Sequence, residues 1–160
     1  MWYERARSPL GEILIAADDD ALRAVLLPTA GEASKPPADW QRRRTALLDE
    51  AKRQIEAYFD GTRYEFKLPL APTGTDFELE VWKELSRVPF GATVSYGDVA
   101  RRIGKPKATR AVGAACGKNP LPLVIPCHRV IAAGGGLGGF SGGLHLKRSL
   151  LSHEAAVARS

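Results

Sequence analysis

The sequence has 160 residues, enough for one ordinary hydrophobic core or two small lobes. Hydrophobic residues make up 44% and charged residues 26%, and no apolar run is long enough to cross a bilayer, so a membrane protein is excluded. The N-terminus carries Glu4 and lacks the apolar core of a signal peptide, which predicts a cytoplasmic protein. Cys116 and Cys127 are the only cysteines, so we expect no disulfide framework and a reducing compartment.

Basic residues are concentrated in the second half of the chain. Residues 1–72 hold 11 Lys and Arg against 12 Asp and Glu, a net charge of −1, whereas residues 73–160 hold 12 against 6, a net charge of +6. Between Leu85 and Leu150 the only acid is Asp98. A charge run is often only a solvated face, but a stretch this one-sided also fits a surface that binds a polyanion.

The first half predicts strands followed by a helix. The strand candidates are separated by turn signals, and they are Tyr3–Arg7, Ile13–Ala17 and Leu22–Leu27. Residues 28–39 read as a surface loop. Apolar residues at helical spacing then predict an amphipathic helix from about Asp39 to Phe59. Nothing here looks chemical, so residues 1–72 are expected to form a structural lobe and residues 60–74 a linker.

The second half opens with clear helix signals. Thr75-Asp76-Phe77-Glu78 is a capping box, followed by a stripe to be buried that comprises Phe77, Val81, Trp82 and Leu85. A second box, Ser95-Tyr96-Gly97-Asp98, starts a helix that runs to about Ile103 and ends at Gly104. Pro106 suits the first position of a further helix to about Cys116. The pair predicts a helix-turn-helix in a domain of residues 73–160.

The second helix of that pair is made mostly of small residues, such as Ala111 and Gly113. One interpretation is plain helix packing. The other is close approach to a DNA backbone, for which a narrow minor groove fits better than the major groove. Arg110 is the one long side chain in the middle of this helix, and it could project into a duplex.

The stretch from Asn119 to Ile131 places one Cys-His pair, Cys127-His128, among apolar residues. A thiolate is a strong nucleophile near neutral pH, and a histidine can accept its proton. Direct neighbours on a strand would face opposite ways, but Pro126 suits a turn, and a water could connect the pair. The alternative is a buried cysteine beside a surface histidine. The spacing fits neither a zinc site nor a papain-like protease, so no metal is predicted.

Gly134-Gly135-Gly136-Leu137-Gly138-Gly139 matches G-x-G-x-x-G, with Glu154 at a suggestive distance. The dinucleotide fingerprint requires a second strand ending in the acid, but Glu154 falls in a helical run that starts at Leu144. We therefore expect a hairpin tip and a close-approach loop, and no cofactor.

These motifs together resemble the O(6)-alkylguanine-DNA alkyltransferases, also called methylated-DNA–protein-cysteine methyltransferases. Pro126-Cys127-His128-Arg129-Val130 matches the family's active-site signature, and the likeness covers more than half of the chain, in order and at the family's spacing. The resemblance implies an α+β fold, with a ribonuclease-H-like N-terminal lobe and a mainly helical, winged helix-turn-helix C-terminal lobe. It implies a monomer that repairs O(6)-alkylguanine, and O(4)-alkylthymine too, in double-stranded DNA by one irreversible transfer to Cys127.

The resemblance also implies roles for individual residues. Cys127 is the alkyl acceptor, His128 deprotonates it through a water, and Glu154 orients His128. Tyr96 donates a hydrogen bond to guanine, and Asn119 is a hinge. DNA contacts are expected from Arg110, which fills the stack after the base flips out, and from Tyr96, Ala111, Lys107 and Arg101. The substrate pocket is expected to include Val130, Ser141, Phe140 and Pro122.

Three departures from the family pattern bear on substrate range: Phe140 replaces a common Tyr, Glu78 a common Gln and His145 a common Trp. Two rival functions remain open. A lesion-binding module without transfer would lack the motif cysteine, and a helix-turn-helix regulator would not need a Cys-His pair in an apolar pocket.

Overall fold

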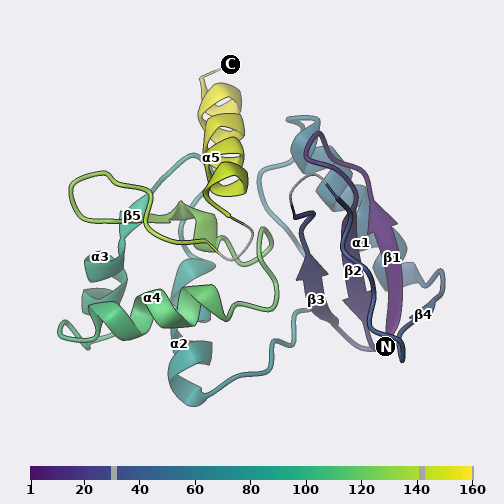
Figure 1. The fold of residues 1–160 in the computed structure, drawn as a ribbon, viewed down its shortest axis with the longest axis horizontal. Coiled ribbons are helices and arrows are strands. Elements are labelled where there is room, and N and C mark those ends of the chain that lie inside the picture. The colour runs from purple at the N-terminus through teal and green to yellow at the C-terminus, as the bar shows by residue number, and fades with distance from the viewer. Residues whose placement is uncertain (30–31, 141–142, 160) are drawn as a thin grey trace. The chain divides into compact units, whose positions relative to one another are not determined.

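The computed structural model describes residues 1–29, 32–140 and 143–159. The chain divides into two compact units, Met1–Thr73 and Gly74–Ser160 (Figure 1). Within the described residues, no helix has the length and apolar character that a membrane crossing requires.

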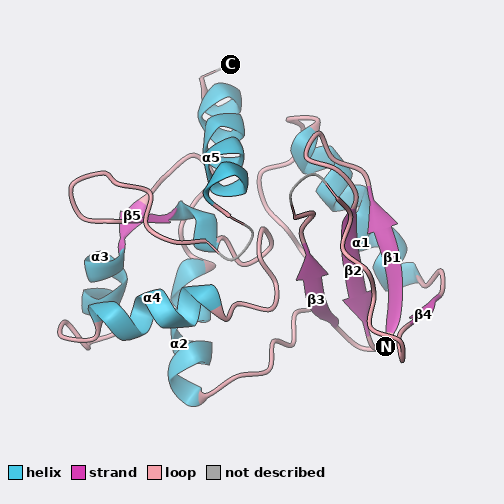
Figure 2. Cartoon of the chain, in the orientation of Figure 1, coloured by secondary structure: helices cyan, strands magenta, loops and turns pink. Residues whose placement is uncertain are grey.

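The N-terminal unit is a four-stranded sheet covered by one helix (Figure 2). Strands β1 (Trp2–Ala6), β2 (Ile13–Ala17) and β3 (Leu22–Leu26) form an antiparallel meander, as the turn signals predict. Helix α1 (Ala46–Phe59) packs on these strands and buries Leu48, Ala51, Ile55 and Tyr58. The core of this unit is therefore formed by β2, which is buried along its whole length, and by the apolar stripe of α1.

The start of α1 corrects the sequence prediction. The helix begins at Ala46, capped by the Thr45 side chain, which accepts a hydrogen bond from the Leu48 N–H at 3.1 Å, and not near Asp39. The residues before it form a short strand, β4 (Gln41–Arg42), which pairs parallel with β1. Pairing with β1 satisfies their backbone groups at the sheet edge, so they are not available to a helix.

The C-terminal unit is mainly helical. It contains α2 (Asp76–Leu85), α3 (Tyr96–Arg102), α4 (Thr109–Gly117) and α5 (Leu144–Ala158), with a two-stranded parallel sheet of β5 (Val94–Ser95) and β6 (Val130–Ile131). Both predicted capping boxes, at the starts of α2 and α3, are confirmed. Helix α4 packs on α2 and α3, and the Trp82 indole N–H donates to the Ala115 carbonyl at 2.9 Å.

The start of α4 differs from the prediction by three residues. Pro106 lies in a turn closed by the Ala108 N–H and the Lys105 carbonyl at 2.9 Å, and the helix begins at Thr109 without a side-chain cap. Gly104, at φ 76°, ends α3 as expected. The two helices are still joined by a tight connection, so the helix-turn-helix arrangement holds.

Candidate active site

Cys127 lies on a single 3-10 turn, η1 (Cys127–Arg129), between Pro126 and β6. Successive side chains of such a turn point about 120° apart. Cys127 lines a cavity of about 550 Å³, whereas the adjacent His128 is fully buried. Cys127 and His128 can therefore serve one site although they are neighbours in the sequence, because they lie on a tight turn and not on opposite faces of a strand.

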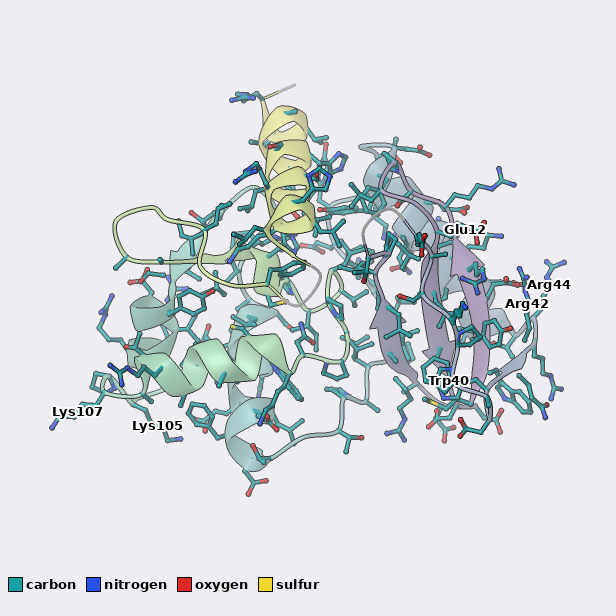
Figure 3. All side chains as sticks on the ribbon, viewed as in Figure 1. Glu12, Trp40, Arg42, Arg44, Lys105 and Lys107 are labelled. Atoms are coloured by element: carbon teal, nitrogen blue, oxygen red, sulfur yellow. The ribbon has the colours of Figure 1, made fainter. Side chains whose placement is uncertain are left out.

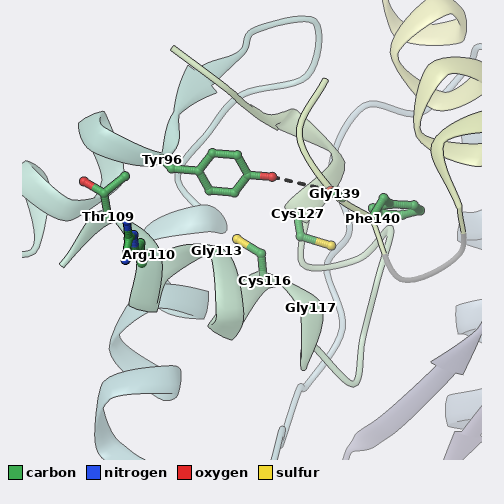
Figure 4. Close-up of a pocket in the computed structure, with 9 residues that line it drawn as sticks. All are labelled: Tyr96, Thr109, Arg110, Gly113, Cys116, Gly117, Cys127, Gly139 and Phe140. Carbon is green, nitrogen blue, oxygen red and sulfur yellow. Dashed lines mark hydrogen bonds between the residues drawn. The ribbon is translucent and has the colours of Figure 1, made fainter. Parts of the chain in front are cut away.

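The cavity lies within the C-terminal unit (Figure 4). Its lining is mostly apolar and comes from α3, α4, η1 and the glycine-rich loop: Tyr96, Thr109, Arg110, Gly113, Cys116, Gly117, Cys127, Gly139 and Phe140. An apolar hollow with a few polar groups is the usual form of a small-molecule or nucleobase site.

Behind the turn, a carboxylate on α5 holds two neighbours of Cys127. Glu154 Oε2 lies 2.7 Å from His128 Nε2, and Arg129 contacts both carboxylate oxygens, with Nε at 2.8 Å and a second nitrogen at 2.9 Å. The Arg129 guanidinium also donates to the Val88 carbonyl at 2.7 Å. All three side chains are buried, so their charges are compensated by each other and not by water.

The protonation states follow from these contacts. Burial alone would raise the pKa of Glu154, but the hydrogen bonds from His128 and Arg129 hold it well below its usual range. Burial lowers the pKa of His128, which favours the neutral ring. A carboxylate only accepts hydrogen bonds, so the ring proton sits on Nε2. His128 Nδ1 is then an acceptor, and it has no partner among the described residues.

Cys127 is held as a thiol that can be ionised. Burial raises its pKa, while a hydrogen bond with the Asn119 side chain and the positive charge of Lys147 oppose that rise. Asn119 also fixes the loop before Cys127, because its amide donates to the Ile125 carbonyl and accepts from the Leu121 N–H, both at 2.9 Å. The arrangement supplies a nucleophile, a base with a free lone pair and a carboxylate that orients the base.

Lys147 is a site residue that the sequence analysis missed. Its ammonium donates to the Val130 carbonyl at 2.6 Å, the Gly139 carbonyl at 3.2 Å and the Tyr96 hydroxyl at 3.4 Å. The signal was available, since Lys147, Leu150 and Glu154 share one face of a helix by their spacing. The role of Arg129 in holding Glu154 was also missed, although the residue stands inside the recognised motif.

The glycine-rich loop makes the close approach that its composition predicted. Gly138 has φ 69°, and a Cβ there would lie 2.5 Å from the Tyr96 hydroxyl oxygen. Tyr96 in turn donates a weak hydrogen bond to the Gly139 carbonyl at 3.4 Å. Burial raises the pKa of Tyr96, so its phenol stays protonated. The loop therefore lies directly against a predicted substrate-contacting side chain.

Other predicted residues fall into three groups. The predicted DNA contacts are exposed: Arg101 lies on α3, Lys107 on the connection, and Arg110 and Ala111 on α4. Figure 3 shows Lys105 and Lys107 extending away from the chain. Arg101 pairs with Asp98. Val130 and Pro122 are buried and are not among the described residues that line the cavity, so their part in the substrate pocket stays a prediction. Ser141 lies outside the described residues.

The described residues contain no cluster of three His, Cys, Asp or Glu side chains that could hold a metal ion.

Comparison with known proteins gives a consistent result over both units. Residues 1–72 match the family model "6-O-methylguanine DNA methyltransferase, ribonuclease-like domain", and residues 76–156 match its "DNA binding domain". A methylated-DNA–protein-cysteine methyltransferase of Methanosarcina acetivorans is 42% identical, over 98% of this chain and 99% of the relative. The constitutive enzyme of Bacillus subtilis is 40% identical, over 96% and 94%.

Solved structures agree. Mycobacterium tuberculosis OGT in complex with DNA superimposes with a TM-score of 0.88 at 38% identity, over 98% of this chain and 94% of that chain. The expected α+β fold, with a ribonuclease-like sheet domain and a helical DNA-binding domain, is confirmed. A thiol on a cavity, backed by a histidine and a carboxylate, is thus found in a chain that belongs to the O6-methylguanine DNA methyltransferase family.

Proposed function

We propose that this protein repairs DNA as a methylated-DNA–protein-cysteine methyltransferase, with Cys127 as the acceptor of the alkyl group from O6-alkylguanine. The observation that carries the proposal is the position of the Cys127 thiol on an apolar cavity, next in sequence to a buried histidine whose Nδ1 has no hydrogen-bond partner within the described part of the chain. Family membership makes the reaction class specific, and the contacts of His128 and Glu154 next to Cys127 support these residue roles.

In the transfer step, His128 takes the thiol proton at Nδ1, through a water, and Glu154 stabilises the resulting imidazolium. The Cys127 sulfur attacks the alkyl carbon, so that a carbon–sulfur bond forms and the carbon–O6 bond breaks. The electron pair of the broken bond stays on guanine. Tyr96, whose raised pKa keeps its phenol protonated, donates a hydrogen bond to the departing base. Guanine takes up one proton from solvent, which balances the thiol proton that His128 accepted, so the base leaves neutral.

The product is a thioether, which is not a leaving group under these conditions. None of the described residues that line the cavity is a base or nucleophile suited to removing the alkyl group from the sulfur. One chain therefore repairs one lesion and stops. Phe140 lines the cavity with an apolar ring that carries no hydroxyl. We therefore expect it to discriminate only weakly between alkyl groups with and without a polar substituent.

The partner is double-stranded DNA from which the damaged base is flipped out at a cost of a few kcal/mol. Small residues on α4 allow close approach to the minor groove, Arg110 fills the vacated stack, and Lys107 and Arg101 contact phosphates. We infer that residues 1–72 serve as a structural lobe and residues 73–160 as the DNA-binding and acceptor domain. We further infer a monomer in the cytoplasm that also accepts O4-alkylthymine.

The test uses a duplex oligonucleotide that contains one O6-methylguanine. After incubation, the intact protein should be heavier by one methyl group, and trypsin should place that group on the peptide of residues 119–129, since cleavage is expected after Lys118 and Arg129. Cys127→Ser should gain no mass. The matched control is Cys116→Ser, which removes the other thiol of the same cavity and should still carry the methyl on residues 119–129.

An unchanged mass together with tight binding to the lesion would favour a recognition module that does not transfer. A methyl group on the peptide of residues 111–118 would assign the acceptor to Cys116 and overturn the proposal.

A further inference from the structure

The cavity holds a second thiol that the transfer reaction does not use. Cys116, on the last turn of α4, lines the same cavity as Cys127, and these are the only two cysteines of the sequence. Both are free thiols, 6% and 3% exposed. Two thiols that line one small cavity can be oxidised to a disulfide.

Asn119 connects the two cysteines. Its backbone N–H donates to the Cys116 carbonyl at 3.4 Å, and its side chain holds the loop that leads to Cys127 by donating to the Ile125 carbonyl at 2.9 Å. Figure 4 shows both side chains entering the cavity from neighbouring segments, with their sulfur atoms turned to opposite sides. Rotation about each Cα–Cβ bond is therefore needed before the sulfur atoms can meet. The adjustment requires the last turn of α4 to open, and Cys116 stands next to the exposed Gly117 and Lys118 at that end of the helix, where helices fray.

We propose that Cys116 and Cys127 form a reversible disulfide when the protein meets a hydroperoxide, so that Cys116 is the resolving thiol of an oxidation site built into the cavity. The consequence for repair rests on the function proposed above: a chain with this disulfide cannot accept an alkyl group, and reduction restores it.

The two steps balance without a further reactant. The Cys127 thiolate attacks one oxygen of hydrogen peroxide, which gives a sulfenic acid and releases hydroxide, and the proton that the Cys127 thiol gave up converts this hydroxide to water. The Cys116 sulfur then attacks the sulfenic sulfur, the sulfur–sulfur bond forms, and the hydroxyl group leaves as water with the Cys116 proton. Two thiols are oxidised to one disulfide, and the peroxide is reduced to two molecules of water.

The order of the two sulfurs follows from their surroundings. Burial raises the pKa of Cys116 to about 12, and the charge of Cys127 adds to that rise. Burial also raises the pKa of Cys127, but Cys127 adjoins His128, whose Nδ1 can take the thiol proton through a water, as in the transfer step. The thiolate therefore forms more readily on Cys127, which makes it the first to react.

The disulfide would protect a protein that is used once. A sulfenic acid left alone is oxidised further to sulfinic and sulfonic acids, which are irreversible for most proteins. Capture by Cys116 diverts the sulfenic acid into a form that ordinary thiols reduce. Without a resolving thiol, the sulfenic acid of Cys127 would react with more peroxide, and the chain could no longer accept an alkyl group.

The test treats the reduced, full-length protein with hydrogen peroxide. Trypsin cleaves after Arg110, Lys118 and Arg129, so the two cysteines fall on separate peptides, residues 111–118 and 119–129. Without reductant, the two peptides should be found joined, with the loss of two hydrogens. Methyl uptake should fall in step with the joined fraction and return after dithiothreitol. In Cys116→Ser, the same treatment should leave oxygen atoms on residues 119–129 and a loss of uptake that dithiothreitol does not reverse.

The inference is overturned if the wild type accumulates sulfinic acid at Cys127 as fast as Cys116→Ser does, or if a non-reducing gel shows that the disulfide joins two chains. The peptide map does not depend on alkyl transfer. If the reduced protein takes up no methyl group but yields the joined peptides after oxidation, the proposed function is wrong and the disulfide inference is retained.

Discussion

In the N-terminal unit charged side chains pair near the surface, whereas in the C-terminal unit they converge in the interior. Arg23 with Asp18, Arg53 with Glu50 and Arg44 with Asp49 are ion pairs whose partners remain at least one-third exposed. Residues 1–73 carry 11 basic and 12 acidic side chains, and residues 74–160 carry 12 and 6. The unit with the surplus of positive charge is the one that buries His128, Arg129, Lys147 and Glu154.

The cavities of the two units differ in the same way. The N-terminal unit has a hollow of about 470 Å³ lined by four cations and three acids: Glu4, Arg42, Arg44, Asp49, Lys52, Arg53 and Glu56. The C-terminal cavity is lined mostly by apolar and small residues around Cys127. Solvated pairs contribute little free energy, while a desolvated network acts strongly on the pKa values of its members. The buried charges that contact one another, His128, Arg129 and Glu154, therefore mark the chemistry, whereas the buried Glu4 of the N-terminal unit pairs with an exposed arginine.

The largest expected effect is that of Glu154→Gln. The change leaves Arg129 buried without its counter-charge, so we expect the free energy of unfolding to fall by about 3–5 kcal/mol. The imidazolium of His128 also loses its stabilising partner, so methyl transfer should slow by about a hundredfold or more. Urea unfolding and single-turnover rates measure the two losses. If the variant transfers the methyl group at the wild-type rate, Glu154 has no part in the reaction.

The pH dependence of stability tests the same network. The pKa of Glu154 is lower in the folded protein than its ordinary 4.5, so the stability it contributes is complete above about pH 4.5 and is lost as the pH falls through the folded pKa. The pKa of His128 is also lowered from 6.5, so protons bound by the unfolded chain below that pH disfavour folding. Unfolding midpoints measured from pH 7 to pH 3 should fall, and less steeply for Glu154→Gln.

The next largest effect is expected from Arg110→Ala. Arg110 is exposed at the cavity and forms no ion pair among the described residues, so its loss should leave the unit folded. If it fills the stack after base flipping, transfer from duplex DNA should slow by about tenfold to a hundredfold, because an unstacking cost of a few kcal/mol is no longer offset. Alkylation by free O6-benzylguanine should change little. An equal loss with both substrates would contradict the assignment.

A smaller effect is expected from Lys107→Ala, on the exposed connection between α3 and α4. One phosphate contact fewer should lower the slope of log affinity against log salt by about 1 without changing the preference for the lesion. Binding to duplex DNA, measured at several salt concentrations, provides the slope. The matched control is Lys35→Ala in the other unit, for which no change in slope is expected.

The smallest effect is expected from Arg42→Ala, in the N-terminal unit. Its guanidinium contacts Glu4 at 2.7 Å but is 59% exposed, and Glu4 keeps a hydrogen bond from the Arg5 N–H. We expect the free energy of unfolding to fall by about 1 kcal/mol or less and methyl transfer to stay unchanged. A slower transfer at a temperature where the variant remains fully folded would show that the two units are coupled, so that surface pairs in the N-terminal unit also affect the chemistry.

Local signals in the sequence predicted well where the interaction itself is local. The capping boxes at Thr75 and Ser95 span three residues each, and both are found. The start of α1 could not be read in this way, because Gln41 and Arg43 hydrogen-bond to Met1 and Tyr3, about forty positions away. A helix-compatible pattern gives no information about a distant strand that competes for the same backbone groups.

The sequence by itself determined the family, the α+β class and the identity of the reactive pair, since Cys127 and His128 stand in a short motif whose spacing is fixed by the chain. The resemblance also named Glu154 as the partner of His128, and only the tertiary structure decided the burial, the distances and the other groups around that pair. Glu154 comes from 26 residues beyond His128, and Lys147 reaches Tyr96 across 51 positions. Burial and charge compensation are properties of residues brought together by folding, so a buried ammonium or a second thiol on the cavity becomes visible only when α4, α5 and the turn at Cys127 are in place.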